Sequence, residues 1–133
     1  MDSHLLAELP IQSHEDIVTA RQKVRTVTQE LGYSLLDQTR IITAVSELAR
    51  NVVIHADGGT MSIFRCQLPR DGVCIVFADQ GPGIQDVERA LQSGYSTAGS
   101  LGLGLPGAQR LSDSMKIDSS PGRGTTVTIC KWL

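Results

Sequence analysis

The spacing of apolar residues predicts two consecutive helices in the first half of the chain. In the first, apolar residues recur every three or four positions and form one stripe: Ile17, Ala20, Val24, Val27 and Leu31. Ser13 and Asp16 have the spacing of a helix start, and Gly32 is a typical helix stop. The second helix follows Ser34 and runs from about Leu35 to Ala56 through a largely apolar stretch. We expect an amphipathic first helix and a more deeply buried second one.

Segments rich in β-branched and apolar residues predict five strands. They are Leu5 to Ile11, Thr60 to Leu68, Val73 to Asp79, Met115 to Ser119 and Thr125 to Trp132. The third is apolar at every position over 73–78, which indicates a central, buried strand. Pro10 in the first has no backbone donor and favours an edge position. A turn containing Pro and Gly joins the second and third strands, so these two are expected to form a hairpin.

Two shorter helices, over Val87 to Leu91 and about Leu105 to Ser114, complete the predicted elements. Most strands are paired as hairpins instead of alternating with helices. The pattern therefore predicts an α+β fold, a two-layer sandwich with a mixed, mostly antiparallel sheet and helices on one face. With 133 residues and no recognisable linker or repeat, the chain is expected to form a single domain over residues 1–133.

Composition narrows the possible partners and compartment. The chain is 41% hydrophobic and carries a formal net charge of -2, so it has no basic excess for nucleic acid. No apolar run approaches the roughly 20 residues of a membrane span, and the first ten residues do not resemble a signal peptide. We expect a cytoplasmic protein. Its cysteines, Cys66, Cys74 and Cys130, lack metal-ligand spacing and are interpreted as buried reduced thiols.

Two polar residues interrupt the apolar pattern of the second helix. Glu47 and Asn51 are four residues apart and therefore project from the same helical face, beside the apolar stripe. A carboxylate near the core is costly unless it is paired, hydrogen-bonded or holding an ion. The pair predicts either a functional site or a solvated flank of the helix, and the two residues alone do not decide between these.

Glycines mark two further segments. Asp79 ends the buried strand and is followed by Gly81 and Gly83, which allow the backbone to pass close to a bound group. Gly102, Gly104 and Gly107 match the dinucleotide pattern G-x-G-x-x-G, but a polar loop and not a strand precedes them, which disfavours that interpretation. The remaining alternatives are a tight turn and a phosphate-binding helix start. The phosphate loop of P-loop ATPases and the signatures of eukaryotic protein kinases do not occur.

The order of these features resembles the GHKL, or Bergerat, ATP-binding fold, which histidine kinases, type II topoisomerases, a heat-shock chaperone and bacterial anti-sigma kinases share. The resemblance rests on Glu47 with Asn51, on Asp79 with its glycines, on the loop closing at Gly102 to Gly107, and on the segment Gly122 to Thr125. It covers nearly the whole chain. It implies ATP and Mg²⁺ as cofactors.

The resemblance also implies a role for each of these residues. Asn51 would coordinate Mg²⁺, Glu47 would be the catalytic general base, and Asp79, helped by Thr125, would accept a hydrogen bond from the adenine amino group. Gly81 and Gly83 would leave space for the adenine ring. The lid would span Ser93 to Leu101 and contain the ligand-binding residues Ser96 and Thr97. The phosphates would be wrapped by Gly102, Leu103, Gly104 and Gly107.

Within this family the short chain is most similar to the anti-sigma serine/threonine kinases, and among them to the stressosome switch kinases. The motifs that carry this similarity are Glu-Leu-Ala-Arg-Asn, Asp-Gln-Gly-Pro-Gly, Gly-Leu-Gly-Leu-Pro-Gly and the terminal Lys131-Trp132-Leu133. The similarity implies a kinase that phosphorylates a STAS-domain antagonist. Once released, it would bind and activate a PP2C-type phosphatase in a sigma-factor stress response. A homodimer is left open.

Two alternatives accompany this interpretation. One is an anti-sigma factor kinase that sequesters a sigma factor directly, and the other is a nucleotide-binding adaptor with little turnover. Glu47 argues against the adaptor, because binding alone requires no general base. Arg50 points away from the site on a helical wheel and is assigned no catalytic role, and His55 is expected to cap or pack at the helix end.

Overall fold

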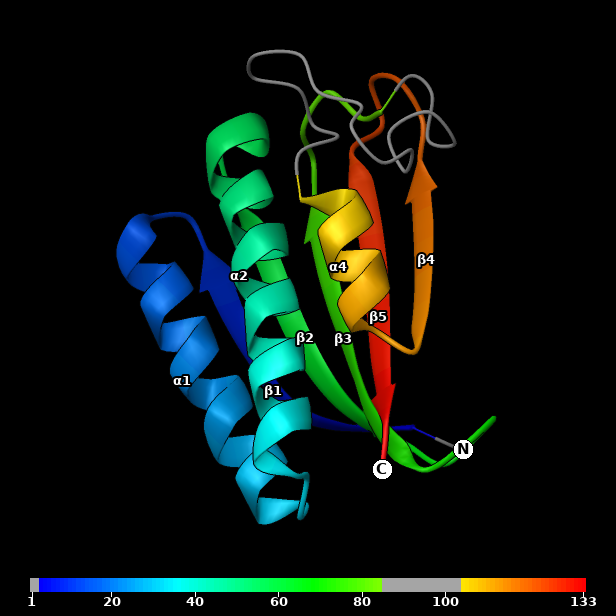
Figure 1. The fold of residues 1–133 in the computed structure, drawn as a ribbon. Helices are drawn as coiled ribbons and strands as arrows, with labels where there is room; N and C mark the ends of the chain where they lie inside the picture. The colour runs from blue at the N-terminus through cyan, green and yellow to red at the C-terminus, as the bar shows by residue number, and fades with distance from the viewer. Residues whose placement is uncertain (1–2, 85–103) are drawn as a thin grey trace.

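The computed structural model describes residues 3–84 and 104–133, and these form a five-stranded sheet with helices on one face (Figure 1). The elements in chain order are β1 (Ser3–Ile11), α1 (His14–Glu30), α2 (Leu35–Ala56), β2 (Gly59–Cys66), β3 (Gly72–Asp79), α4 (Leu105–Leu111), β4 (Ser114–Ser119) and β5 (Thr125–Trp132). The predicted helix over Val87 to Leu91 lies outside the described residues. The two-layer α+β sandwich is confirmed.

The two long helices begin and end at the predicted signals. Ser13 caps α1 in a capping box with Asp16, and the chain leaves the helix at Gly32 with a φ of 85°. Ser34 caps α2 by accepting a hydrogen bond from the N–H of Asp37. These local hydrogen bonds satisfy backbone groups that the first helical turn leaves without partners.

The sheet has the strand order β1-β2-β3-β5-β4. All four pairings within the described residues are antiparallel, so the parallel component expected of a mixed sheet is not found among them. β1 with its Pro10 lies at the edge and β3 is central, both as predicted. In the β3–β5 register Asp79 lies opposite Thr125.

The core lies between the sheet and α2. Buried side chains from α2 include Ile41, Val45 and Leu48, and they belong to one cluster with Ile75 and Phe77 of β3. Burying a large apolar side chain contributes roughly 1.5–3 kcal/mol, so this helix is the main apolar partner of the central strand. Among the residues that the structure describes, no helix is long and apolar enough to cross a membrane.

The last helix is shorter than predicted. α4 ends at Leu111, and Ser112 is already extended with φ −106° and ψ 155°, because the chain turns directly into β4 at Ser114. The predicted end at Ser114 was therefore wrong. The small polar residues after Leu111 belong to the connection and to the first strand position.

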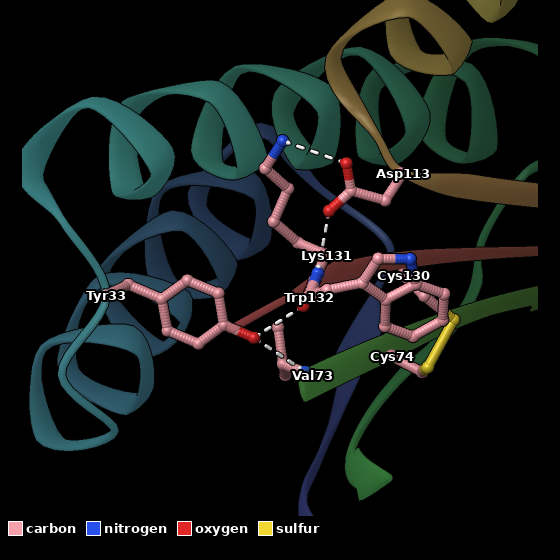
Figure 2. Close-up of a disulfide and its surroundings, with 7 residues drawn as sticks. All are labelled: Tyr33, Val73, Cys74, Asp113, Cys130, Lys131 and Trp132. Carbon is pink, nitrogen blue, oxygen red and sulfur yellow. Dashed lines mark hydrogen bonds and ion pairs between the residues drawn. A yellow bond between two sulfur atoms is a disulfide. The ribbon is translucent and has the colours of Figure 1, made fainter. Parts of the chain in front are cut away.

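The cysteine interpretation is also wrong for two of the three residues. Cys74 of β3 lies directly opposite Cys130 of β5, and the two form a disulfide (Figure 2). Only Cys66 is free, and partial burial raises the pKa of its thiol. Apolar strand patterns indicate that both cysteines are buried, but the pairing depends on the register between strands that are 56 residues apart.

Candidate active site

A pocket opens where the last turns of α2, the end of β3, the start of β5 and the start of α4 meet. It is lined by Leu48, Asn51, Val52, Phe77, Asp79, Ile84, Leu105, Thr125 and Val127. Six of these side chains are apolar and three are polar. The pocket therefore combines apolar walls with a few polar groups that can fix the orientation of a ligand.

The two polar residues of the sheet meet because of strand register. Asp79 is the last residue of β3 and lies opposite Thr125, the first residue of β5. Oδ1 of Asp79 accepts a hydrogen bond of 2.9 Å from the N–H of Gly81. A carboxylate has four lone-pair sites, so this bond leaves acceptor capacity toward the pocket. Asp79 and Thr125 are therefore neighbours at the pocket, and their predicted joint role toward adenine stays a prediction.

Ser119 organises the hydroxyl group of Thr125, a role that the sequence did not reveal. Its Oγ accepts from the N–H of Ile84 at 2.8 Å and donates to the carbonyl of Gly124 at 2.9 Å. The Oγ also lies 2.8 Å from Oγ1 of Thr125. Because the single proton of Ser119 is used on Gly124, we assign Thr125 as the donor in that pair. The oxygen of Thr125 is then left to accept a hydrogen bond.

The predicted pair on α2 is divided between the pocket and its rim. Asn51 lines the pocket, whereas Glu47 lies beside it with 35% of its side-chain area exposed. Gly104, the N-cap of α4, packs on Glu47 so closely that a Cβ on this glycine would lie 2.8 Å from Oε2 of Glu47. Gly104 and the side chain of Glu47 are thus in close contact, with no room for a larger residue at position 104.

Arg50 does not line the pocket, but its side chain reaches the carboxylate at the rim. Its Nη1 lies 3.6 Å from Oε1 of Glu47. The helical wheel predicts the direction in which a side chain leaves the helix, but an arginine is long enough to reach back one turn. His55, in the last turn, is partly buried, and this burial lowers the pKa of its imidazole.

Close packing within the protein explains why glycines follow β3, without any ligand. A Cβ on Gly81 would lie 2.7 Å from Cβ of Ala56, and Gly83 has a φ of 78° and packs on the carbonyl of Ser120. They let the exit of β3 pass close to α2 and to the β4–β5 turn. Their predicted role toward a nucleotide base stays a prediction.

Four of the predicted ligand-binding residues lie in the part of the chain that the structure does not describe. Ser96, Thr97, Gly102 and Leu103 lie outside the described residues, as does the expected lid. Gly107 lies within α4. In the ranges 3–84 and 104–133 no three His, Cys, Asp or Glu side chains gather as a metal cluster.

Comparison with known proteins identifies the family. Residues 12–131 match the model of the histidine kinase-like ATPase domain. The serine/threonine-protein kinase RsbT of Bacillus subtilis is 45% identical over 124 residues, which cover 92% of this chain and 93% of that protein. An anti-sigma F factor from Caldanaerobacter subterraneus is 32% identical over 119 residues, covering 86% of this chain and 83% of that protein.

A solved structure shows the same fold. The crystal structure of the RsbU and RsbW domains of Rv1364c from Mycobacterium tuberculosis superimposes with a TM-score of 0.65 at 21% identity. The similarity covers 96% of this chain and 33% of that one. The identity to RsbT and the ATPase domain together support a protein kinase, as the motifs predicted. The chain belongs to the histidine kinase-like ATPase domain family.

Proposed function

We propose that this protein is a serine/threonine kinase that transfers the γ-phosphoryl group of Mg-ATP to a STAS-domain antagonist. When released, it binds and activates a PP2C-type phosphatase in a sigma-factor stress response, with all three proteins in the cytoplasm. The observation that carries the proposal is one pocket lined by Asn51, Asp79 and Thr125 with Glu47 at its rim. The 45% identity to the kinase RsbT adds to it.

The polar groups of the pocket fit an adenine base. Apolar walls such as Val52 and Phe77 suit a flat aromatic ring. The carboxylate of Asp79 and the hydroxyl oxygen of Thr125 both act as acceptors at the end of the β3–β5 pair. Two neighbouring acceptors match an exocyclic amino group and disfavour a carbonyl oxygen at the same position. ATP is therefore preferred over GTP.

Asn51 and Glu47 of α2 suit the phosphate groups of ATP. The amide oxygen of Asn51 is a suitable ligand for Mg²⁺, which when bound would neutralise charge on the phosphates. Glu47 has a partly exposed carboxylate at the rim, where the hydroxyl of a protein serine can reach it. As general base it would take the hydroxyl proton onto an Oε atom while the serine oxygen attacks the phosphorus.

The test of this chemistry compares Glu47→Ala and Glu47→Gln with the parent protein. Both variants should bind ATP within about threefold of the parent and lose at least 100-fold in the rate of phosphotransfer to a STAS-domain protein. ATP affinity is measured by calorimetry and transfer by radiolabelled phosphate. Equal transfer by Glu47→Gln and parent would exclude Glu47 as the base.

A second candidate is an anti-sigma factor kinase that sequesters a sigma subunit directly. Its support is the 32% identity to an anti-sigma F factor over 86% of the chain. A pull-down with purified sigma factor, STAS-domain protein and PP2C-type phosphatase separates the two candidates. Stable association with the sigma factor alone would overturn the switch-kinase proposal.

A further inference from the structure

Ser119, the last residue of β4, is bonded to two residues of the pocket wall. In the β4–β5 register it lies opposite Thr125, and its Oγ is 2.8 Å from Oγ1 of that residue. The same Oγ bonds to the N–H of Ile84 at 2.8 Å and to the carbonyl of Gly124 at 2.9 Å. Thr125 and Ile84 are among the described residues that line the pocket, and Ser119 is not. Ser119 can therefore act on a ligand only through these neighbours.

The three contacts use the whole hydrogen-bonding capacity of the Ser119 hydroxyl. A hydroxyl group has one proton to donate and two lone pairs that accept. The N–H of Ile84 can only donate and the carbonyl of Gly124 can only accept, so one lone pair and the proton are used. The second lone pair is left for Thr125, which must supply the proton of that bond. The opposite assignment would leave the two oxygens of Ser119 and Gly124 2.9 Å apart with no proton between them.

This assignment restricts Thr125 to one role in the pocket. A free hydroxyl group can rotate, so it can donate to a carbonyl oxygen or accept from an amino group. With its proton held by Ser119, Thr125 can only accept. Its neighbour Asp79, opposite it at the end of β3, is also an acceptor when ionised. A ligand group that meets both must donate, and an oxo group in the same place would face two acceptors without a proton to share.

The backbone around Ser119 is held on two sides, so the hydroxyl has a fixed position. Ser119 itself is paired with β5. In the turn that follows, the N–H of Gly122 donates to the carbonyl of Pro82 at 2.8 Å, and the carbonyl of Ser120 packs on Gly83. The segment after β3 and the β4–β5 turn are thus joined by backbone contacts as well as by Ser119. A group held in this way is preorganised to position its neighbour.

We propose that Ser119 is a positioning residue that sets the nucleotide specificity of the pocket. It holds the proton of Thr125 away from the ligand. The pocket then favours a purine with an exocyclic amino group over one with an oxo group at the same place. The inference rests on the proposed function, because that function places the adenine base at Asp79 and Thr125. It adds the residue that selects between purines without touching them.

The experiment compares ATP with ITP in the presence of Mg²⁺. The base of ITP has an oxo group where adenine has its amino group, and it lacks the second exocyclic group of guanine. Calorimetry gives the ratio of the two dissociation constants for the parent and for each variant. Ser119→Ala releases the proton of Thr125, which can then be donated to the oxo group. We expect the preference for ATP to fall about fivefold, mainly because ITP binds more tightly than it does to the parent.

A double-mutant cycle separates positioning from general support of the pocket. Thr125→Val removes the hydroxyl group through which Ser119 is proposed to act. In that background Ser119→Ala should change the ratio by less than about twofold, because nothing is left to position. Ser119→Thr keeps a hydroxyl group and should retain the ratio of the parent. The control Ser114→Ala, at the exposed first position of the same strand, should also retain it.

The outcomes distinguish this inference from the proposed function. An unchanged ratio in Ser119→Ala, an equal loss of affinity for ATP and ITP, or the same fall in the ratio in both backgrounds would each overturn the role of Ser119 and leave the proposed function standing. If the parent binds ATP and ITP equally well, the proposed adenine contact and this inference both fail. Ser119→Cys has a thiol that accepts only weakly, so its ratio should lie between those of Ser119→Ala and the parent. It tests the same point if the alanine variant does not fold.

Discussion

The two ends of the β3–β5 strand pair differ in how their polar groups are satisfied. At the closed end, formed by Val73, Cys74, Cys130 and Lys131, polar groups bond to one another (Figure 2). The Tyr33 hydroxyl donates to the carbonyl of Lys131 and accepts a 2.7 Å bond from the N–H of Val73. At the pocket end, Asp79 and Thr125 keep acceptor capacity that faces a hollow.

A second set of bonds completes the closed end. The ammonium group of Lys131 lies 3.4 Å from Asp113 and 3.6 Å from Asp37, and Asp113 accepts a 2.7 Å bond from the N–H of Trp132. These contacts join the first turn of α2, the segment after α4 and the last strand. One end of the sheet thus provides stability and the other presents unused acceptors. Substitutions at the closed end should change the free energy of unfolding, and substitutions at the pocket end should change the affinity for ATP.

The largest expected effect is the removal of the disulfide. Cys74→Ala/Cys130→Ala releases a constraint between positions 56 residues apart, and should lower the free energy of unfolding by about 4 kcal/mol. ATP affinity should change less than twofold. Urea unfolding with and without a dithiol reductant measures the effect. The reductant should lower the stability of the parent and of the control Cys66→Ala, and should leave the double variant unchanged. If the reductant does not affect the parent, Cys74 and Cys130 are thiols.

The next effect concerns the pocket end. Asp79→Asn can still accept the N–H of Gly81 through its amide oxygen, but it presents an amide N–H₂ where the proposed adenine amino group needs an acceptor. We expect ATP affinity to fall at least 30-fold, about 2 kcal/mol, with little change in unfolding free energy. Calorimetric titration with ATP measures it. The control Asp118→Asn, an exposed carboxylate on β4, should bind normally, and normal binding by Asp79→Asn would exclude the proposed adenine contact.

At the closed end, Tyr33→Phe removes only the hydroxyl group. The N–H of Val73 and the carbonyl of Lys131 then lose a shared partner in a buried position, which should cost about 1–3 kcal/mol of unfolding free energy. Urea unfolding gives this value, and calorimetry should show unchanged ATP affinity. A large loss of ATP affinity would contradict the division between the two ends.

The same hydroxyl predicts a pH dependence. Burial raises the pKa of Tyr33 from 10.0 to about 12, so the folded state keeps the proton that the unfolded state loses. The contribution of Tyr33 to stability is therefore fully present below pH 10 and is lost as the pH rises toward 12. Urea unfolding between pH 9 and pH 11 should show a steeper decline for the parent than for Tyr33→Phe. Parallel declines would show that Tyr33 titrates normally.

The sequence predicts one end of this strand pair better than the other. Periodicity, caps and glycines are local signals, and they place Asn51 and Asp79 on the elements that form the pocket. The closed end depends on side chains that meet across the sheet. A single tyrosine in a short connection does not indicate that its hydroxyl joins two strands. Ser119 is similar, because strand alternation places it on the same face as Met115 and Ile117 but does not indicate that its hydroxyl joins Ile84, Gly124 and Thr125.

The smallest expected effect is at the rim of the pocket. Arg50 and Glu47 are separated by 3.6 Å, and both side chains are substantially exposed, so the pair is screened by water. Arg50→Ala should change the free energy of unfolding by less than about 0.5 kcal/mol and phosphotransfer by less than threefold. Thermal unfolding and the transfer assay measure these values. A tenfold loss of transfer would show that Arg50 positions the carboxylate of Glu47 at the rim.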